Sequence, residues 1–226
     1  MLTVSKRLEK IAGLVPKGAR VADIGADHGY LSIFLIKQNI ADFVYACDIR
    51  PKPLLNAQHN ITAANAQNIE LRLCDGLEGI NEPDIDAAVI AGMGGEVIAG
   101  IIDRCNWIKN PCYTLILQPM TSSEELRKYL YVNGFIINTE AAVEDENRIY
   151  TVLSVKYCGK PYPFTQKDLY IGSLNPKNST DLIYINKQLN RLQKCCDDIK
   201  NIATKQAEFL CLEQTIHEIT EFIGGK

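Results

Sequence analysis

The stretch that decides the fold reads VADIGADHGYL, from Val21 to Leu31. Its first half is an apolar, β-branched run typical of a buried strand, and its second half opens an amphipathic segment typical of a helix. Glycines at such a strand-to-helix turn let the backbone approach a ligand and leave N–H groups free to bind it. We therefore expect a ligand site at the end of this strand.

Further apolar runs follow at regular intervals and alternate with amphipathic stretches. The runs are residues 20–24, 43–49, 69–74, 86–92 and 113–119, and helices are expected near 29–38, 52–66, 95–107 and 122–132. This alternation is typical of a parallel sheet covered by helices on both faces. Two β-rich segments, 135–143 and 148–157, joined by the acidic residues 144–147, predict a terminal antiparallel hairpin. The predicted fold class is α/β, a Rossmann-like sheet that ends in this hairpin.

A second part of the chain has a helical pattern. After the proline-rich linker GKPYPF (159–164), apolar residues spaced three and four apart run from Leu182 to Ala203 and, in a shifted phase, from Phe209 to Ile223. The shift favours an antiparallel helix pair over one long helix. The predicted domains are residues 1–158 and a C-terminal helical, coiled-coil-like domain, 159–226. That second domain is either a packing layer or an arm that grips a large substrate.

Composition excludes several classes of protein. Hydrophobic residues make up 46% and charged residues 23%, as in folded globular proteins. No apolar run approaches the ~18 residues of a membrane-spanning helix, and the N-terminal residues lack the apolar segment of a secretory signal, so we expect a cytoplasmic protein.

The net charge of −3 argues against strong non-specific binding to nucleic acid, although basic residues cluster near the N-terminus. The oligomeric state is undecided, with a monomer favoured.

The cysteines show no metal-binding pattern. None of the eight lies in a CxxC motif, and no histidine lies at zinc-ligand spacing from them, so we expect no metal site. Scattered thiols of this kind are typical of reduced, buried, small apolar residues. They are Cys47, Cys74, Cys105, Cys112, Cys158, Cys195, Cys196 and Cys211.

Polar and glycine-rich segments follow the other expected strands. Asp48 ends the second, where a carboxylate can accept hydrogen bonds from both hydroxyls of a ribose. Asp75-Gly76 and residues 91–95 (AGMGG) follow the third and fourth, and such loops gather at one rim of a parallel sheet. Asp27 stands where a dinucleotide fingerprint has its middle glycine. A carboxylate there repels a pyrophosphate and attracts a sulfonium or an ammonium, which favours S-adenosylmethionine (SAM) over NAD.

The motifs DIGADHGYL (23–31), CDGL (74–77), AGMGG (91–95) and LQP (117–119), with the acidic end of the second strand, resemble the bacterial tRNA (adenine-22-N1)-methyltransferase family. The resemblance covers nearly the whole chain. It implies a class I SAM-dependent methyltransferase domain followed by a helical domain, and a reaction that transfers the methyl group of SAM to N1 of adenine 22 in tRNA. Adenine N1 already presents an in-plane lone pair, so alignment and desolvation would supply most of the catalysis.

Site residues carry over from the resemblance position by position. The cofactor would be bound by Asp23, Gly25, Asp27, His28, Gly29, Asp48, Ile49, Asp75, Gly76 and Gly92. The candidates around the transferred methyl group are Asp27, His28, Met93 and Gly94. Independently of the resemblance, Lys6, Arg7 and Lys10 share one helical face and are expected to contact the tRNA, together with Tyr30 and with Gln118, whose amide could read a base edge. Two alternatives stay open: a methyltransferase acting on a small molecule or a protein, and a module that binds SAM and RNA without turnover.

Overall fold

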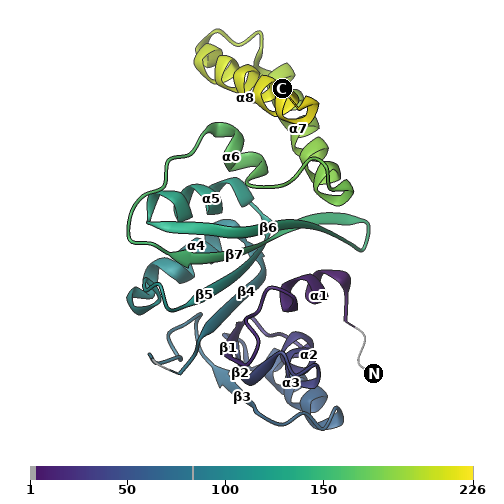
Figure 1. Ribbon diagram of the computed structural model, residues 1–226, viewed down its shortest axis with the longest axis vertical. Helices are drawn as coiled ribbons and strands as arrows, with labels where there is room; N and C mark the ends of the chain where they lie inside the picture. The colour runs from purple at the N-terminus through teal and green to yellow at the C-terminus, as the bar shows by residue number, and fades with distance from the viewer. Residues whose placement is uncertain (1–3, 83, 226) are drawn as a thin grey trace.

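The computed structural model describes residues 4–82 and 84–225 and is built on a seven-stranded sheet (Figure 1). The strands are β1 (Ala19–Ile24), β2 (Ala41–Asp48), β3 (Ile69–Leu73), β4 (Ala87–Gly94), β5 (Thr114–Thr121), β6 (Phe135–Asp145) and β7 (Arg148–Tyr157). Their spatial order is β3-β2-β1-β4-β5-β7-β6. Strands β1 to β5 are parallel, and β7 pairs antiparallel with both β5 and β6. The predicted sheet and hairpin are confirmed.

The helices cover the sheet and extend beyond it. They are α1 (Lys6–Ala12), α2 (Tyr30–Lys37), α3 (Pro51–Ala63), α4 (Gly95–Arg104), α5 (Ser123–Val132), α6 (Gln166–Ile171), α7 (Ser179–Ile199) and α8 (Gln206–Gly224), with short 3-10 turns at Asn106–Ile108 and Ala203–Lys205. No helix in the described ranges is both long enough and apolar enough to cross a membrane.

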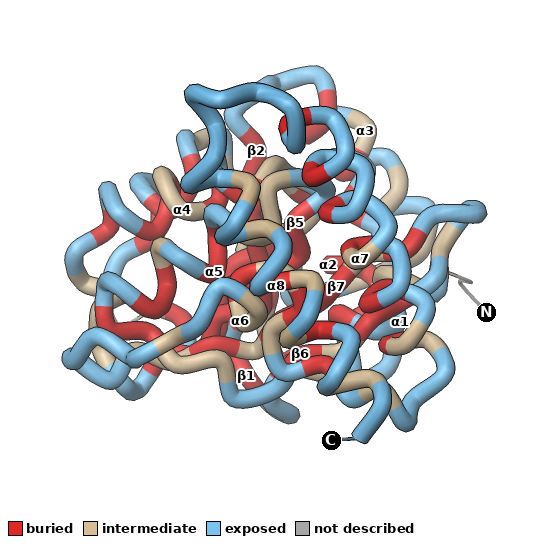
Figure 2. The backbone as a smooth tube through the Cα atoms, turned by 90° about the horizontal axis from the view of Figure 1, so that it is seen from above, coloured by how far each residue is buried: buried red, intermediate tan, exposed pale blue. Residues whose placement is uncertain are grey.

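The central strands are buried on both faces, as their unbroken apolar sequence predicts. Neighbouring residues of β1 belong to different clusters: Val21 packs with Ile11 of α1 and Leu35 of α2, whereas Ala22 packs with Ile98 of α4 and Leu126 of α5. Figure 2 shows these buried segments under the exposed helices. The two layers fix the sheet rigidly, so the loops at the carboxyl ends of β1 to β4 are held in place.

The hairpin turn has a specific backbone requirement. Glu146 and Asn147 both have positive φ angles, 47° and 61°, as a two-residue turn of type I′ demands. Asparagine tolerates this left-handed conformation better than most residues do.

The C-terminal segment packs on the hairpin at one end of the molecule (Figure 1). Tyr184, Ile185 and Ile219 share an apolar cluster with Ala142 and Ile149 of the hairpin strands. Helix α8 runs back along α7, so the antiparallel pair is confirmed, and the chain turns between 200 and 205 without glycine or proline.

The linker is anchored rather than free. The backbone N–H of Tyr162 donates to the carbonyl of Tyr131 at 2.8 Å, and the rings of Tyr131 and Phe164 stack at 5.4 Å. Helix α6 was not predicted. It begins with a capping box in which Thr165 and Asp168 bind each other's backbone N–H groups.

A fully buried ion pair joins the sheet region to this segment. Arg127 of α5 donates to Glu140 of β6 at 2.5 Å, and both side chains are completely inaccessible to solvent. Arg127 also donates to the carbonyl of Leu169 at 2.8 Å, and Glu140 accepts from the N–H of Ser173 at 3.1 Å. The division at residue 158 stays a prediction, and its outer limits, residues 1 and 226, lie outside the described residues.

The prediction for the cysteines is only partly correct. All eight are free thiols, as expected, but Cys112, Cys158, Cys195 and Cys211 are exposed rather than buried. Cys112 and Cys158 lie outside helices and strands, whereas Cys195 and Cys211 lie on exposed positions of α7 and α8. Within the described ranges, no group of three or more His, Cys, Asp or Glu side chains could hold a metal ion.

Candidate active site

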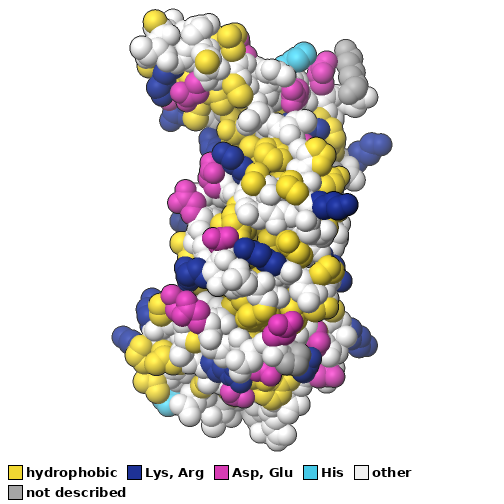
Figure 3. Space-filling model, turned by 90° about the vertical axis from the view of Figure 1, so that its left-hand side faces the viewer, with side chains coloured by type: hydrophobic (Ala, Val, Ile, Leu, Met, Phe, Trp, Pro, Cys, Tyr) yellow, Lys and Arg dark blue, Asp and Glu magenta, His cyan; other side chains and the backbone are white. Residues whose placement is uncertain are grey.

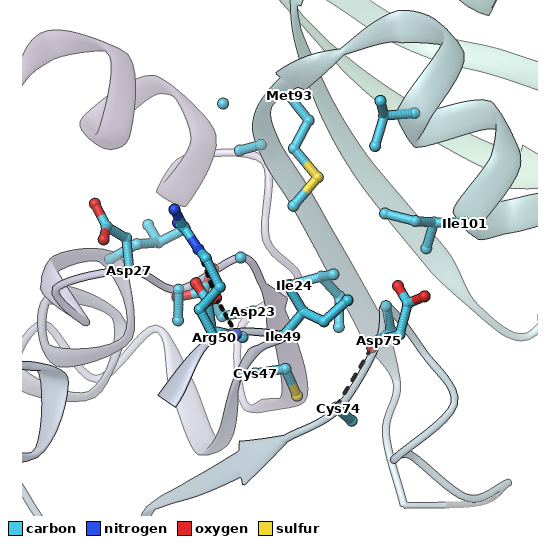
Figure 4. A pocket seen from close by; sticks show the side chains of 18 of the residues that line it. Asp23, Ile24, Asp27, Cys47, Ile49, Arg50, Cys74, Asp75, Met93 and Ile101 are labelled. Atoms are coloured by element: carbon cyan, nitrogen blue, oxygen red, sulfur yellow. Dashed lines mark hydrogen bonds and ion pairs between the residues drawn. The ribbon is translucent and has the colours of Figure 1, made fainter. Parts of the chain in front are cut away.

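The loops that follow β1, β2, β3 and β4 surround one cavity of about 800 Å³. This volume suits a ligand of nucleoside size. Asp27 and Asp48, which come from different loops, line the same cavity. Figure 4 shows Asp27 and Asp75 on opposite sides of it, with Ile24 and Ile49 between them.

The first loop is held in an unusual backbone shape. Gly25, Asp27 and Gly29 all have positive φ angles, of 77°, 49° and 71°. The positive φ of Gly25 favours glycine at this position, and a side chain there would also displace the Met93 methyl group where β1 meets the AGMGG segment. The N–H groups of Gly25 and Ala26 donate to the carbonyl of Cys47 at 2.8 and 2.9 Å, which fastens this loop to the end of β2.

Asp23 is the most deeply buried carboxylate of the cavity. It is 4% exposed, and its Oδ2 accepts a 2.6 Å hydrogen bond from the hydroxyl of Ser32. Burial raises the pKa of Asp23 to about 6, although the Ser32 hydrogen bond opposes this. A buried carboxylate with one neutral partner is a favourable place for an ammonium group.

Asp27, His28 and Tyr30 form the rim of the cavity. The carboxylate of Asp27 lies 3.6 Å from Nε2 of His28, and both side chains are about half exposed. The rings of His28 and Tyr30 stack at 5.6 Å. Together these groups offer a planar surface and a negative charge at the entrance.

Asp48 and Asp75 are fixed by arginine and backbone groups. Oδ1 of Asp48 accepts from the N–H of Arg50 at 2.9 Å, and Asp48 is 5% exposed. Asp75 forms a 3.1 Å ion pair with Arg104 of α4. A side chain at Gly76 would lie 2.9 Å from Ile101, so the third loop packs closely against α4.

Gln118 connects the AGMGG segment to the N-terminal helix. It is completely buried, and its Oε1 accepts from Arg7 at 2.7 Å and from the N–H of Gly92 at 3.2 Å. Its Nε2 donates to the carbonyl of Pro119 at 2.9 Å. Arg7 also lies 3.6 Å from the carboxylate of Asp145 at the end of β6. Helix α1, strand β5 and the end of β6 are therefore joined beside Gly92.

Comparison with known proteins identifies the family. Residues 4–153 match the family described as a methyltransferase domain. The chain is 31% identical over 209 residues to the tRNA (adenine(22)-N(1))-methyltransferase of Bacillus subtilis (strain 168), covering 89% of this chain and 88% of the relative. The chain belongs to the TrmK-like tRNA m1A22 methyltransferase family.

Solved structures agree with this family assignment. The crystal structure of B. subtilis TrmK matches with a TM-score of 0.82 at 28% identity, over 99% of this chain and 100% of that one. M. capricolum TrmK in complex with S-adenosyl-homocysteine (SAH) matches with a TM-score of 0.79 at 27% identity, over 98% of each chain. The protein is a class I SAM-dependent methyltransferase, which confirms SAM as the cofactor in preference to NAD.

The donor set of the cavity suits this cofactor. SAM carries a sulfonium, an ammonium and a ribose. The described walls offer carboxylates at the carboxyl ends of β1, β2 and β3 and from Glu96 after β4, and apolar groups such as Ile24 and Ile49. Carboxylates attract the two cationic groups, and apolar side chains can cover the adenine ring.

Most of the predicted site residues line the cavity. They are Arg7, Asp23, Gly25, Asp27, His28, Tyr30, Asp48, Ile49, Asp75, Gly76, Gly92 and Met93. Gly29 and Gly94 do not: a side chain at Gly29 would lie 3.1 Å from Ala57 of α3, and one at Gly94 would lie 3.3 Å from the hydroxyl of Thr121. Both glycines therefore permit close packing.

The structure places the residues predicted to contact tRNA in different locations. Lys6 and Lys10 line a separate cleft of about 410 Å³ beside Glu144 and Thr180, away from Arg7. Gln118 is corrected from a residue that reads a base edge to one that holds Arg7 and the AGMGG segment, because its amide groups are used inside the protein.

Several cavity residues were missed or assigned no cofactor role. Val97 and Ile101 of α4 and Met120 of β5 line the cavity, together with Arg50 and Arg104. In sequence the apolar three fit the pattern of ordinary core positions. Val97 and Met120 are exposed in the structure despite their apolar character, a property that the sequence pattern does not reveal.

Proposed function

We propose that this enzyme transfers the methyl group of SAM to N1 of adenine 22 in tRNA. The observation that carries the proposal is that Ala91, Gly92 and Met93 of the glycine-rich segment, which Gln118 holds, line the same cavity as the exposed His28 and Tyr30 rings. A planar base can enter between the rim and this segment. The full-length similarity to the B. subtilis enzyme supports the same acceptor.

In this proposal the inner cavity residues bind the cofactor. Asp23 holds the ammonium group, Asp48 holds the ribose hydroxyls, and Ile49 covers the adenine ring of SAM. Asp75 and Gly76 contact the edge of that ring. SAM supplies an electrophilic methyl group on a positively charged sulfur.

The residues around the methyl group align the acceptor rather than deprotonate it. Adenine N1 attacks through an in-plane lone pair, the bond from sulfur to the methyl carbon breaks, and a proton leaves the cationic base afterwards. Met93 and the backbone at Gly92 shape the floor, while His28 and Tyr30 offer a stacking surface for the base. The Asp27 carboxylate at the rim attracts the positive charge that develops on the base.

Recognition of the tRNA body uses dispersed basic residues. Lys6 and Lys10 line the cleft between α1 and the hairpin, beside the start of α7. Figure 3 shows Lys and Arg side chains interspersed with Asp and Glu over one face, from the sheet to the C-terminal helices. Few phosphates are then neutralised, so we expect a modest dependence of tRNA affinity on salt.

The test is methylation of matched tRNA transcripts with labelled SAM. We expect label in a transcript with adenine at position 22 and none when that base is changed to guanine, with a reverse-transcription stop at position 22 as the second readout. Label only in small molecules or proteins would favour the other acceptor classes. Binding of SAH and tRNA without transfer would identify a non-catalytic module. An Asp48→Ala variant serves as the cofactor-binding control.

A further inference from the structure

Two cysteines lie side by side in the wall of the cofactor cavity. Cys47 is near the end of β2, and Cys74 directly follows β3, the neighbouring parallel strand. The N–H of Cys74 donates to the carbonyl of Asp48 at 3.1 Å, and in the parallel register Cys47 lies opposite Arg72, two residues before Cys74. Both residues line the cavity and belong to one apolar cluster, and Figure 4 shows them adjacent.

Cys74 is surrounded by Arg72, the Gly79 segment and two backbone carbonyls, because its thiol donates to the carbonyls of Arg72 at 3.9 Å and Gly76 at 3.6 Å. The guanidinium of Arg72 stacks on Tyr45 at 4.0 Å and donates to the carbonyl of Gly79 at 2.6 Å. A side chain at Gly79 would lie 2.7 Å from Sγ of Cys74, so this backbone segment packs directly on the sulfur. Cys74 is also half-buried rather than fully enclosed, and a neighbouring cation with partial exposure is typical of reactive cysteines.

The environment shifts the pKa values of the two thiols in opposite directions. The adjacent Cys47 side chain, with the Gly79 N–H and Arg72, lowers the pKa of Cys74 to about 7, although burial and Asp75 oppose the shift. The Cys74 side chain, together with burial and the charge of Asp23, raises the pKa of Cys47. Cys74 is therefore the more acidic thiol of the pair, and Cys47 holds its proton more strongly.

We propose that Cys74 and Cys47 form an oxidation site for hydroperoxides in the wall of the cofactor cavity. The Cys74 thiolate attacks one peroxide oxygen, the O–O bond breaks, and a sulfenic acid forms as the other oxygen leaves and takes up a proton. The Cys47 sulfur then attacks Cys74, the S–O bond breaks, and water leaves with the Cys47 proton. Two thiols lose two electrons to the peroxide, and a disulfide results.

The disulfide would alter cofactor binding. A sulfur–sulfur bond of about 2.05 Å draws the two strand ends together. Cys74 precedes Asp75, and the carbonyl of Cys47 holds the first loop through Gly25 and Ala26. Bridging therefore shifts both loops. Conversely, bound SAM or SAH covers the cavity wall and shields Cys74. This inference depends on the shared cofactor cavity and is independent of the methyl acceptor.

The experiment treats the full-length protein with hydrogen peroxide at neutral pH and maps disulfides by mass spectrometry of alkylated peptides. We expect a Cys47–Cys74 linked peptide before oxidation of the exposed cysteines, slower linking with saturating SAH, and about tenfold weaker SAH binding by calorimetry, restored by dithiothreitol. Cys47→Ser should leave a sulfenic acid at Cys74 that dimedone traps. The matched control Cys211→Ser should behave as the wild type.

Three results would each overturn the proposal. The first is oxidation of the exposed cysteines without the linked peptide in wild-type protein. The second is a linked protein with unchanged SAH affinity. The third is linking at the same rate with and without SAH. The mapping uses the wild type, so a poorly folded variant does not weaken the test.

Discussion

Replacing Asp48 tests the cofactor site most directly. Its Oδ1 is already bound by the N–H of Arg50 at 2.9 Å, and no group within the described residues donates to Oδ2. If Asp48 holds the ribose, Oδ2 supplies the main acceptor. Asp48→Asn keeps an oxygen for the Arg50 N–H and places a donor where that acceptor was, whereas Asp48→Ala removes both.

The magnitude follows from the burial of the carboxylate. A hydrogen bond to a charged group contributes about 1.5–3 kcal/mol, and Asp48 is nearly inaccessible to solvent, so little screening reduces this value. The loss corresponds to an SAH dissociation constant raised about 10- to 150-fold. Both variants should show it, and Asp48→Asn should retain more stability than Asp48→Ala.

Titration calorimetry with SAH is the assay, with thermal unfolding to verify the fold. Asp42→Asn is the matched control, because Asp42 is an exposed residue at the opposite end of the same strand. If Asp48→Asn binds SAH within about threefold of the wild type while remaining folded, the ribose does not depend on this carboxylate.

Three further predictions concern other buried groups. Because burial raises the pKa of Asp23 to about 6, SAH affinity should fall about tenfold per pH unit below that value, and calorimetry should show a flatter profile for Asp23→Asn. In the free protein the sign is opposite: the contribution of Asp23 to stability is full below pH ~4 and is lost as pH rises through about 6. Gln118→Leu, which leaves Arg7 without its amide partner, should lower kcat about tenfold or more with SAH affinity retained, as single-turnover and calorimetric measurements would reveal. Arg127→Met should reduce the free energy of unfolding in urea by about 3–5 kcal/mol, and a second change, Glu140→Leu, should recover most of it; equal losses in the single and double variants would contradict the ion-pair argument.

The sheet could be predicted from the sequence because its strands are buried on both faces. Apolar, β-branched runs are typical of strands buried on both faces. The bounds of the runs 20–24 and 148–157 agree with those of β1 and β7 to within one residue. The gathering of Asp27 and Asp48 at one cavity followed from the rule that loops at the carboxyl ends of parallel strands meet. The location of the site was therefore predicted by the order of the strands and helices rather than by any single motif.

Contacts between distant residues could not be predicted in the same way. Arg7 and Gln118 are 111 positions apart, and their 2.7 Å hydrogen bond depends on how α1 crosses the end of β5. A basic residue near the N-terminus suggests a polyanion partner, but this one is used mainly inside the protein. The wall residue Val97 was missed for a related reason: an apolar position on a helix has the same pattern in a core and in a cavity.

The buried ion pair changes how the helical segment should be interpreted. Arg127 and Glu140 belong to the sheet region, yet two of their partners, the Leu169 carbonyl and the Ser173 N–H, lie beyond the linker. Removing residues after 159 would leave a buried guanidinium and a buried carboxylate short of hydrogen bonds, and such groups are strongly destabilising when unpaired. Loss of activity in a truncated chain would then reflect a weakened sheet as much as a lost tRNA contact. The contribution of this segment to tRNA binding is therefore separable only through its exposed charges, which substitutions can alter without disturbing the ion pair.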